Sequence, residues 1–425
     1  MAASVMAAVL IAPVACSPTD DWHDGQEDVT ESGTGDESGG ESGGESGGQE
    51  GDREFETAEQ AVVNMGAGWN LGNTLDSNSG DTQNMWIEAW SSRTTKDYET
   101  AWGQPVTTRE LIHMFKEAGF GAIRVPVTWY PHMGTITLYD TKKWDPSTWS
   151  GTQVDPLWMA RVQEVVDYVI DEGLYCILNV HHDTGASDTA WLIAGEEEFS
   201  AAEYRFRALW DQIAGRFRDY GEKLLFEAYN EMLDKYDSWC FASFASDARY
   251  DAEAAQSAYN GINSYARAFA ETVRSSGGNN AQRNIIVNTY GGCSGDGTWS
   301  SHLKEPLSNL QIPEEPGHIA VQVHSYWDAA KFSSQKADID LLFKNLDTYV
   351  VKRLGVPAII GEWGGSANGD DGANVTFAGY FSRKAKDSGI AAYWWMGLSD
   401  GEDRAVPRWS MPLTKDAILQ PYAGN

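Results

Sequence analysis

The sequence predicts an α/β fold, a (β/α)₈ barrel with extended βα loops. From residue 65 onward, apolar segments of strand length alternate with segments of helical periodicity. The strand segments are almost continuously apolar, which is typical of parallel strands covered on both faces. Eight such units favour a closed barrel over the alternative, an open doubly wound sheet. The expected strands are 67–71, 122–127, 175–181, 224–230, 284–289, 319–324, 358–362 and 391–395.

The N-terminal segment is typical of an export signal. Residues 1–15 are almost entirely small and apolar, too short to cross a bilayer but similar to the core of a signal peptide. Cys16 follows directly, as at a lipoprotein cleavage site. We therefore expect residues 1–16 to be a signal peptide and the protein to be extracellular, or tethered to the membrane surface by a lipidated Cys16. The alternative is an apolar segment with no targeting role.

An acidic Gly/Ser-rich linker is expected over residues 17–59. Glu-Ser-Gly-Gly occurs three times from Glu37 to Gly48, and residues 20–59 contain fifteen Asp or Glu but one Arg. Such a composition cannot bury a core and gives a flexible, self-repelling chain. The folded domain is therefore expected over residues 60–425.

The net charge of −31 limits the classes of partner. It disfavours nucleic acid, anionic lipid and acidic polysaccharide through repulsion, so a neutral partner is expected. The 18 Trp and 18 Tyr exceed what a core needs, and exposed aromatic faces bind sugar rings. Nothing in the sequence requires more than a monomer.

Three cysteines fall in the expected domain. Cys176 lies within an apolar segment and is expected to be a small core residue. Cys240 and Cys293 are the candidates for one disulfide, because three cysteines allow at most one bridge. No CxxC or Cys/His spacing suggests zinc, and we expect neither a metal nor an organic cofactor.

Three helices have clear boundary signals. One is expected over residues 155–173, from an Asp-Pro pair to a glycine, and another over 107–119, from two threonines to a glycine. Ser200 and Glu203 have the spacing of a capping box, which predicts a helix from there to Gly221. The longest loops, 73–106, 131–154 and 232–250, follow strands, so we expect them to form the walls of a cleft at the C-terminal face of the barrel.

Polar side chains follow the expected strands at their C-terminal ends, the edge where barrel active sites form. Glu231 and Glu362 are the most informative, because a carboxylate at the edge of a core is costly and usually serves chemistry. Two carboxylates on different strands are what hydrolysis of a glycosidic bond requires. The other polar and aromatic residues at strand ends are Arg124, His181, His182, Asn230, His324, Tyr326, Trp394 and Trp395.

Six motifs in register carry a resemblance to a known family. They are Gly68-Trp69-Asn70-Leu71-Gly72-Asn73-Thr74-Leu75-Asp76, Ile123-Arg124-Val125-Pro126, Val180-His181-His182-Asp183, Tyr229-Asn230-Glu231, Val323-His324-Ser325-Tyr326 and Ile360-Gly361-Glu362-Trp363-Gly364. With these motifs, residues 60–420 resemble the cellulase family of glycoside hydrolases, family 5 of clan A. The resemblance implies a barrel enzyme that retains the anomeric configuration.

The resemblance also implies roles for the strand-end residues. Glu231 would be the general acid/base, and Glu362 would be the nucleophile that forms a glycosyl-enzyme. Arg124 and Tyr326 would donate hydrogen bonds to Glu362 and stabilise its charge, and His324 would orient Glu231.

Five further residues are expected to contact the sugar. The resemblance implies that Asn230 binds the 2-hydroxyl, that His181 binds another hydroxyl and that Trp395 forms the apolar floor of the subsite. Asn73 and Asp76 match positions that contact more distant sugars.

Simpler interpretations remain for some of these residues. Asn73 and Asp76 are also consistent with a turn, and Trp394 is the alternative to Trp395. A metal site at His181 and His182 is disfavoured, because adjacent residues of a strand face opposite ways.

The sequence thus predicts an endo-acting, retaining β-1,4-glycanase that hydrolyses β-glucan, either cellulose or mixed-linkage glucan. A xyloglucanase or β-mannanase of the same family is the alternative. A non-catalytic polysaccharide-binding barrel is the rival from another class, but Glu231, Glu362, Arg124 and Tyr326 are all present.

Overall fold

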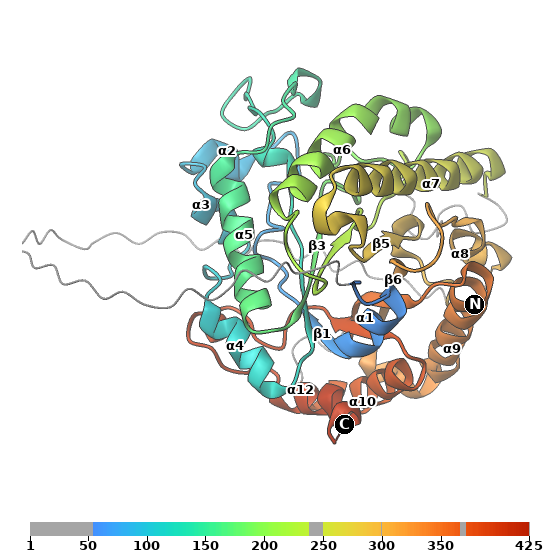
Figure 1. Cartoon of the computed structure of the whole chain (residues 1–425). Helices are drawn as coiled ribbons and strands as arrows, with labels where there is room; N and C mark the ends of the chain where they lie inside the picture. The colour runs from blue at the N-terminus through green and yellow to red at the C-terminus, as the bar shows by residue number, and fades with distance from the viewer. Residues whose placement is uncertain (1–53, 238–249, 299, 366–370, 425) are drawn as a thin grey trace, which may run out of the picture. The chain divides into compact units, whose positions relative to one another are not determined.

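The computed structural model describes residues 54–424 except 238–249, 299 and 366–370, and in it eight parallel strands close into a barrel (Figure 1). Each strand pairs with its neighbours in sequence, and β8 pairs with β1. The expected (β/α)₈ barrel is therefore confirmed. The strands are β1 (Ala67–Asn70), β2 (Ala122–Val125), β3 (Tyr175–Asn179), β4 (Leu224–Glu227), β5 (Ile285–Asn288), β6 (Ile319–Trp327), β7 (Ala358–Gly365) and β8 (Ala391–Trp394).

Helices surround the strands, as Figure 1 shows. Buried apolar side chains fill the layer between the outer face of the barrel and these helices. The helices are α1 (Ala58–Met65), α2 (Trp86–Trp90), α3 (Thr95–Glu99), α4 (Arg109–Ala118), α5 (Pro156–Asp171), α6 (Glu196–Arg216), α7 (Ala252–Ser275), α8 (Glu305–Asn309), α9 (Phe332–Asn345), α10 (Asp371–Asp387), α11 (Glu402–Ala405) and α12 (Pro412–Leu419).

Two of the three helix boundary predictions are confirmed. The Asp155 side chain caps α5, and the Thr108 side chain caps α4, which ends at Gly119 in the left-handed conformation. The capping box at Ser200 is wrong, because α6 begins four residues earlier and ends at Arg216. Three glutamates in its first turn favour that earlier start through the helix dipole.

The domain begins before residue 60, so the expected boundary is corrected. Thr57 and Gln60 form a capping box that starts α1. The preceding backbone is also bound to the barrel, since Phe55 N donates to Gln282 Oε1 at 3.0 Å and Glu56 O accepts from Asn284 Nδ2 at 3.0 Å. The apolar face of α1 shares one buried cluster with inward side chains of the strands, listed here as Ala58, Ala61, Val62, Met65, Ala122, Tyr175, Ile177, Leu225, Ile286, Ala320, Ile359, Ala391 and Tyr393.

Two strands differ from the prediction in ways that matter for chemistry. β4 ends at Glu227, so Glu231 lies in the loop four residues later, whereas β7 continues past Glu362 to Gly365. A register shift between Val323 and His324 of β6 accompanies this longer pairing. Glu231 therefore lies on a loop, whereas Glu362 lies on a strand.

The cysteine predictions are met in part. Cys176 is buried and free. Cys293 is disulfide-bonded, but Cys240, its expected partner, lies outside the described residues.

The expected signal peptide, Cys16 and most of the acidic linker also lie outside the described residues. Among the residues that are described, no helix is long and apolar enough to cross a membrane.

The long loops after β1 and β2 have structure of their own. Residues 73–106 contain α2 and α3, and residues 131–154 lie against them, since Met85 N donates to Lys142 O at 2.7 Å. That these loops form the walls of a cleft stays a prediction.

Replacing Gly261 of α7 with alanine is expected to destabilise the domain. A Cβ there would lie 2.3 Å from the backbone nitrogen of Gly195, so α7 would have to move away. We expect a loss of about 1–3 kcal/mol, seen as a lower Tm in calorimetry. Gly215→Ala in α6 is the control, because nothing lies within 4 Å of its added Cβ; alanine should stabilise there by roughly 0.5–1 kcal/mol. Equal Tm values would contradict this packing.

Candidate active site

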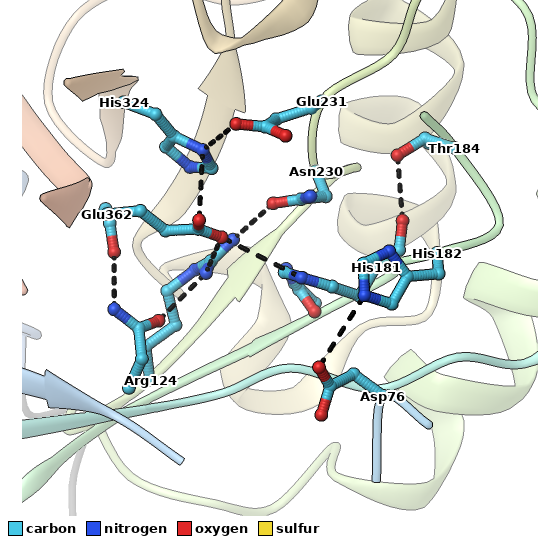
Figure 2. Close-up of polar contacts among 12 residues, drawn as sticks. Asp76, Arg124, His181, His182, Thr184, Asn230, Glu231, His324 and Glu362 are labelled. Atoms are coloured by element: carbon cyan, nitrogen blue, oxygen red, sulfur yellow. Dashed lines mark hydrogen bonds and ion pairs between the residues drawn. The ribbon is translucent and has the colours of Figure 1, made fainter. Parts of the chain in front are cut away.

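The two carboxylates meet at the C-terminal end of the barrel, as Figure 2 shows. Glu231, His324 and Glu362 each place one ligand atom within 4.8 Å of the others. His324 Nδ1 lies 2.7 Å from Glu231 Oε1 and 3.6 Å from Glu362 Oε2. Carboxyl groups about 5–5.5 Å apart are typical of retaining glycosidases, whereas inverting enzymes leave room for a water between them. The spacing therefore favours retention.

Glu362 is held as a carboxylate by three groups. Arg124 Nη1 donates to Oε1 at 2.8 Å, and the Tyr326 hydroxyl donates to Oε2 at 2.5 Å. Burial opposes ionisation of Glu362, but His324, Arg124 and the Tyr326 hydrogen bond outweigh it and lower the pKa below its ordinary value. An ionised carboxylate at this position can act as a nucleophile.

Glu231 and Glu362 also raise the pKa values of His324 and Tyr326, the two hydrogen-bond donors on β6. Burial lowers the pKa of His324, but Glu362 and Glu231 outweigh it and raise that pKa above its ordinary value. Burial of its hydroxyl, together with Glu362 and Glu231, raises the pKa of Tyr326 far above its ordinary value. Tyr326 therefore remains a proton donor, although the residue as a whole is half exposed.

Arg124 has a second carboxylate partner that the sequence reasoning missed. Its Nε and Nη2 donate to Glu227 Oε2 and Oε1 at 2.6 and 2.8 Å, and both residues are fully buried. The expected partner of Arg124 was Glu362 alone, but the guanidinium binds both carboxylates. Glu227 could have been found, because it is a charged residue inside an apolar strand and must be paired.

Asn230 is oriented by the same arginine. Its Oδ1 accepts from Arg124 Nη2 at 2.7 Å, and its backbone oxygen accepts from Asn288 Nδ2 at 3.1 Å. With Oδ1 on the guanidinium, the amide nitrogen is the group of Asn230 that is left to meet another partner. Contact with a sugar hydroxyl stays a prediction.

His181 and Trp395 lie beside Glu362. His181 Nε2 is 3.8 Å from Glu362 Oε1, and the rings of His181 and Trp395 stack at 5.6 Å and 3°. Burial, followed by His182, Arg124 and His324, keeps the pKa of His181 well below its ordinary value, so it is neutral. Trp394 instead packs in the core, so Trp395 is the residue of the pair that lies beside His181. Its role as the floor of a sugar subsite stays a prediction.

Asp76 shapes a turn. Its carboxylate accepts the backbone N–H groups of Asn73 and Thr74 at 3.1 and 2.8 Å, and the side chain is fully buried. The expected contact of Asp76 with a sugar is therefore not supported. Asn73 has a left-handed backbone (φ 60°), which this turn requires, and its sugar contact stays a prediction.

The prediction that His181 and His182 face opposite ways on a strand is wrong. β3 ends at Asn179, so strand alternation does not apply, and the two rings lie 4.4 Å apart. Together with Asp76 they place three ligand atoms within 4.8 Å of one another. These groups have protein partners too, because His181 Nδ1 lies 3.1 Å from Asn179 Nδ2 and Asp76 binds the turn.

Comparisons with known proteins agree with this geometry. The sequence profile of the family described as Cellulase (glycosyl hydrolase family 5) matches residues 81–400. Endoglucanase A of Clostridium longisporum is 31% identical over 388 residues, which are 86% of this chain and 66% of that protein. The chain spans about two thirds or less of the first curated relatives that it matches.

Solved structures are similar as well. A GH5-4 broad-specificity endoglucanase from an uncultured bacterium is 48% identical with a TM-score of 0.79, covering 89% of this chain and 99% of that one. A family 5 enzyme from Prevotella bryantii B14, solved with a xyloglucan tetradecasaccharide, is 36% identical with a TM-score of 0.71 and covers 87% and 99%.

The lowered pKa of Glu362 predicts how its contribution to stability varies with pH. The ordinary value is 4.5, and the folded-state value lies below it. The ionised carboxylate therefore stabilises the fold above the ordinary value, and this contribution is lost as pH falls through the folded-state pKa. The stability of the wild type relative to Glu362→Gln should be greater at about pH 6 than at about pH 3. Thermal unfolding across that range tests it, and the opposite trend would contradict the assigned environment.

Proposed function

We propose the activity of this chain from its family membership: it belongs to the cellulase family, glycosyl hydrolase family 5, whose profile matches residues 81–400. The protein hydrolyses internal β-1,4 bonds of a neutral glucan and retains the anomeric configuration. The observation that supports this most directly is the placement of Glu231 and Glu362 oxygens within 4.8 Å, with Glu362 held ionised.

The first step forms a covalent intermediate. Glu362 Oε attacks the anomeric carbon as the glycosidic C–O bond breaks, and Glu231 donates its proton to the leaving oxygen. Arg124 and Tyr326 hold the nucleophile in place. Because both groups are preorganised donors, little reorganisation is needed when charge moves from the carboxylate to the sugar.

The second step releases the sugar. Glu231, now ionised, takes a proton from water as the water oxygen attacks the anomeric carbon, and the bond to Glu362 breaks. His324 contacts Glu231 at 2.7 Å and carries a raised pKa, so it stabilises Glu231 in this ionised form. Two displacements at one carbon give net retention.

The remaining site residues bind the sugar. The Asn230 amide nitrogen donates to the 2-hydroxyl, an interaction that strengthens toward the oxocarbenium-like transition state. Neutral His181 binds a neighbouring hydroxyl, and the Trp395 ring, stacked on His181, forms the apolar floor.

The substrate is an uncharged polymer. With a net charge of −31, the chain repels acidic polysaccharides. We propose unbranched cellulose or mixed-linkage glucan as the main substrate. Xyloglucan is the second candidate, because one similar structure is a broad-specificity endoglucanase and another binds a xyloglucan oligosaccharide.

The two carboxylate roles predict opposite stereochemistry on chemical rescue. With azide and a dinitrophenyl β-cellobioside, Glu362→Gly should give the α-glycosyl azide, because azide enters on the side that the nucleophile has left. Glu231→Ala should give the β-glycosyl azide, because azide then attacks the glycosyl-enzyme. Without azide, each variant should lose at least about 10³-fold in turnover. NMR of the products identifies the anomer that each variant forms. A β-glycosyl azide from Glu362→Gly and an α-glycosyl azide from Glu231→Ala would mean that the two carboxylates have the opposite roles.

Substrate preference can be tested with the wild-type protein on four polymers. Reducing-sugar release should be fastest on carboxymethyl-cellulose or barley β-glucan, slower on xyloglucan and slowest on glucomannan. A rapid fall in viscosity relative to sugar release would show endo action. Activity confined to glucomannan, or none on any polymer, would contradict the proposed function.

A further inference from the structure

Glu227 is a buried carboxylate that cannot reach a substrate. It lies at the end of β4, and its side chain is fully buried. It accepts two hydrogen bonds from Arg124, at 2.6 and 2.8 Å. Its Oε1 also accepts from Asn179 Nδ2 at 3.2 Å and from Asn288 Nδ2 at 3.1 Å. Four N–H donors from β2, β3 and β5 therefore fix this carboxylate.

Glu227 determines which way Arg124 points. Besides the two bonds to Glu227, Arg124 Nη1 donates to Asn70 and Glu362 at 2.9 and 2.8 Å, and Nη2 donates to Asn230 at 2.7 Å. All five guanidinium N–H donors thus have one acceptor each. With its Nε edge bound by Glu227, the planar group can present only Nη1 to Glu362. Rotation would break several buried bonds at once.

The charge of Arg124 is divided between two carboxylates. Arg124 and Glu227 are fully buried and Glu362 is almost so, which strengthens their interaction relative to water. If Arg124 faced Glu362 alone, its full charge would stabilise the nucleophile. A carboxylate that is stabilised too strongly is a weaker base and a poorer nucleophile. A second negative group on the same guanidinium offsets this effect.

We propose that Glu227 is a positioning residue for the nucleophile: it aims one Arg124 N–H at Glu362 and offsets the arginine charge so that Glu362 stays reactive. The inference rests on the proposed function, because it takes Glu362 as the nucleophile. A purely structural ion pair would support the fold but would not change how the reactivity of Glu362 depends on pH.

The test is Glu227→Gln, which keeps the side-chain shape and removes the charge. The rate at which a 2-deoxy-2-fluoro-β-cellobioside with a good leaving group labels the enzyme is measured against pH. We expect labelling to slow by about 100-fold, and its acidic limb to move to lower pH by at least about half a unit, because uncompensated Arg124 favours ionised Glu362. An unchanged limb, or one moved to higher pH, would overturn the proposal.

Glu99→Gln is the matched control. Glu99 is also buried, and its two oxygens accept from Arg161 Nε and Nη2 at 2.9 and 2.8 Å, between α3 and α5. This variant should have a lower Tm but an unchanged acidic limb. If it shifts the limb as Glu227→Gln does, the effect comes from stability alone and the proposal is wrong.

Glu227→Asp provides a second variant should Glu227→Gln fail to fold. It keeps the charge but is one methylene shorter, so the acidic limb should stay in place while labelling slows by about 10-fold through misplacement of Arg124. Labelling at the wild-type rate would overturn the positioning role. Mass spectrometry of the labelled wild type distinguishes a failure of the proposed function from a failure of this inference. A label away from Glu362 refutes the proposed function, whereas a label on Glu362 with unaltered variants refutes only this inference.

Discussion

The guanidinium of Arg124 is the group on which the site depends. It lies fully buried, and its five donors bind Glu227, Glu362, Asn230 and Asn70. A buried charge is tolerated only where partners satisfy it completely. Through these bonds one side chain of β2 connects residues of β1, β4 and β7 with the loop after β4. Glu362 and its neighbours are therefore positioned by the barrel itself.

The closed barrel makes this arrangement feasible. Its N-terminal half is filled by apolar side chains and covered by α1, whereas its C-terminal end holds the charged network. Separating the two regions leaves the carboxylates surrounded by low-dielectric protein, where donors such as Tyr326 and Arg124 act strongly. His324 lies between Glu231 and Glu362 and contacts both. The environment that lowers the pKa of Glu362 is thus a property of the fold.

Much of this could be predicted from local patterns. All eight strands lie where apolar segments indicated, because a strand buried on both faces leaves an unambiguous signature. The start of α6 was missed, since a chance Ser-x-x-Glu spacing competed with an acidic first turn. Asp76 matched a sugar-binding position, but its carboxylate is buried and accepts backbone N–H groups. Glu227 was not predicted, because it lies within a strand, whereas site residues were predicted at the C-terminal ends of the expected strands.

The sequence alone determined the order of the elements, the family motifs and the identity of both carboxylates, because each is written in residues that are close along the chain. Only the tertiary structure decided which groups touch. Arg124 and Glu227 are 103 positions apart, and Arg124 and Glu362 are 238 apart. Pairing over such separations depends on strand register and on where each strand ends, and local composition does not encode either. The lowering of the pKa of Glu362 follows from those contacts, so it too is set by the fold.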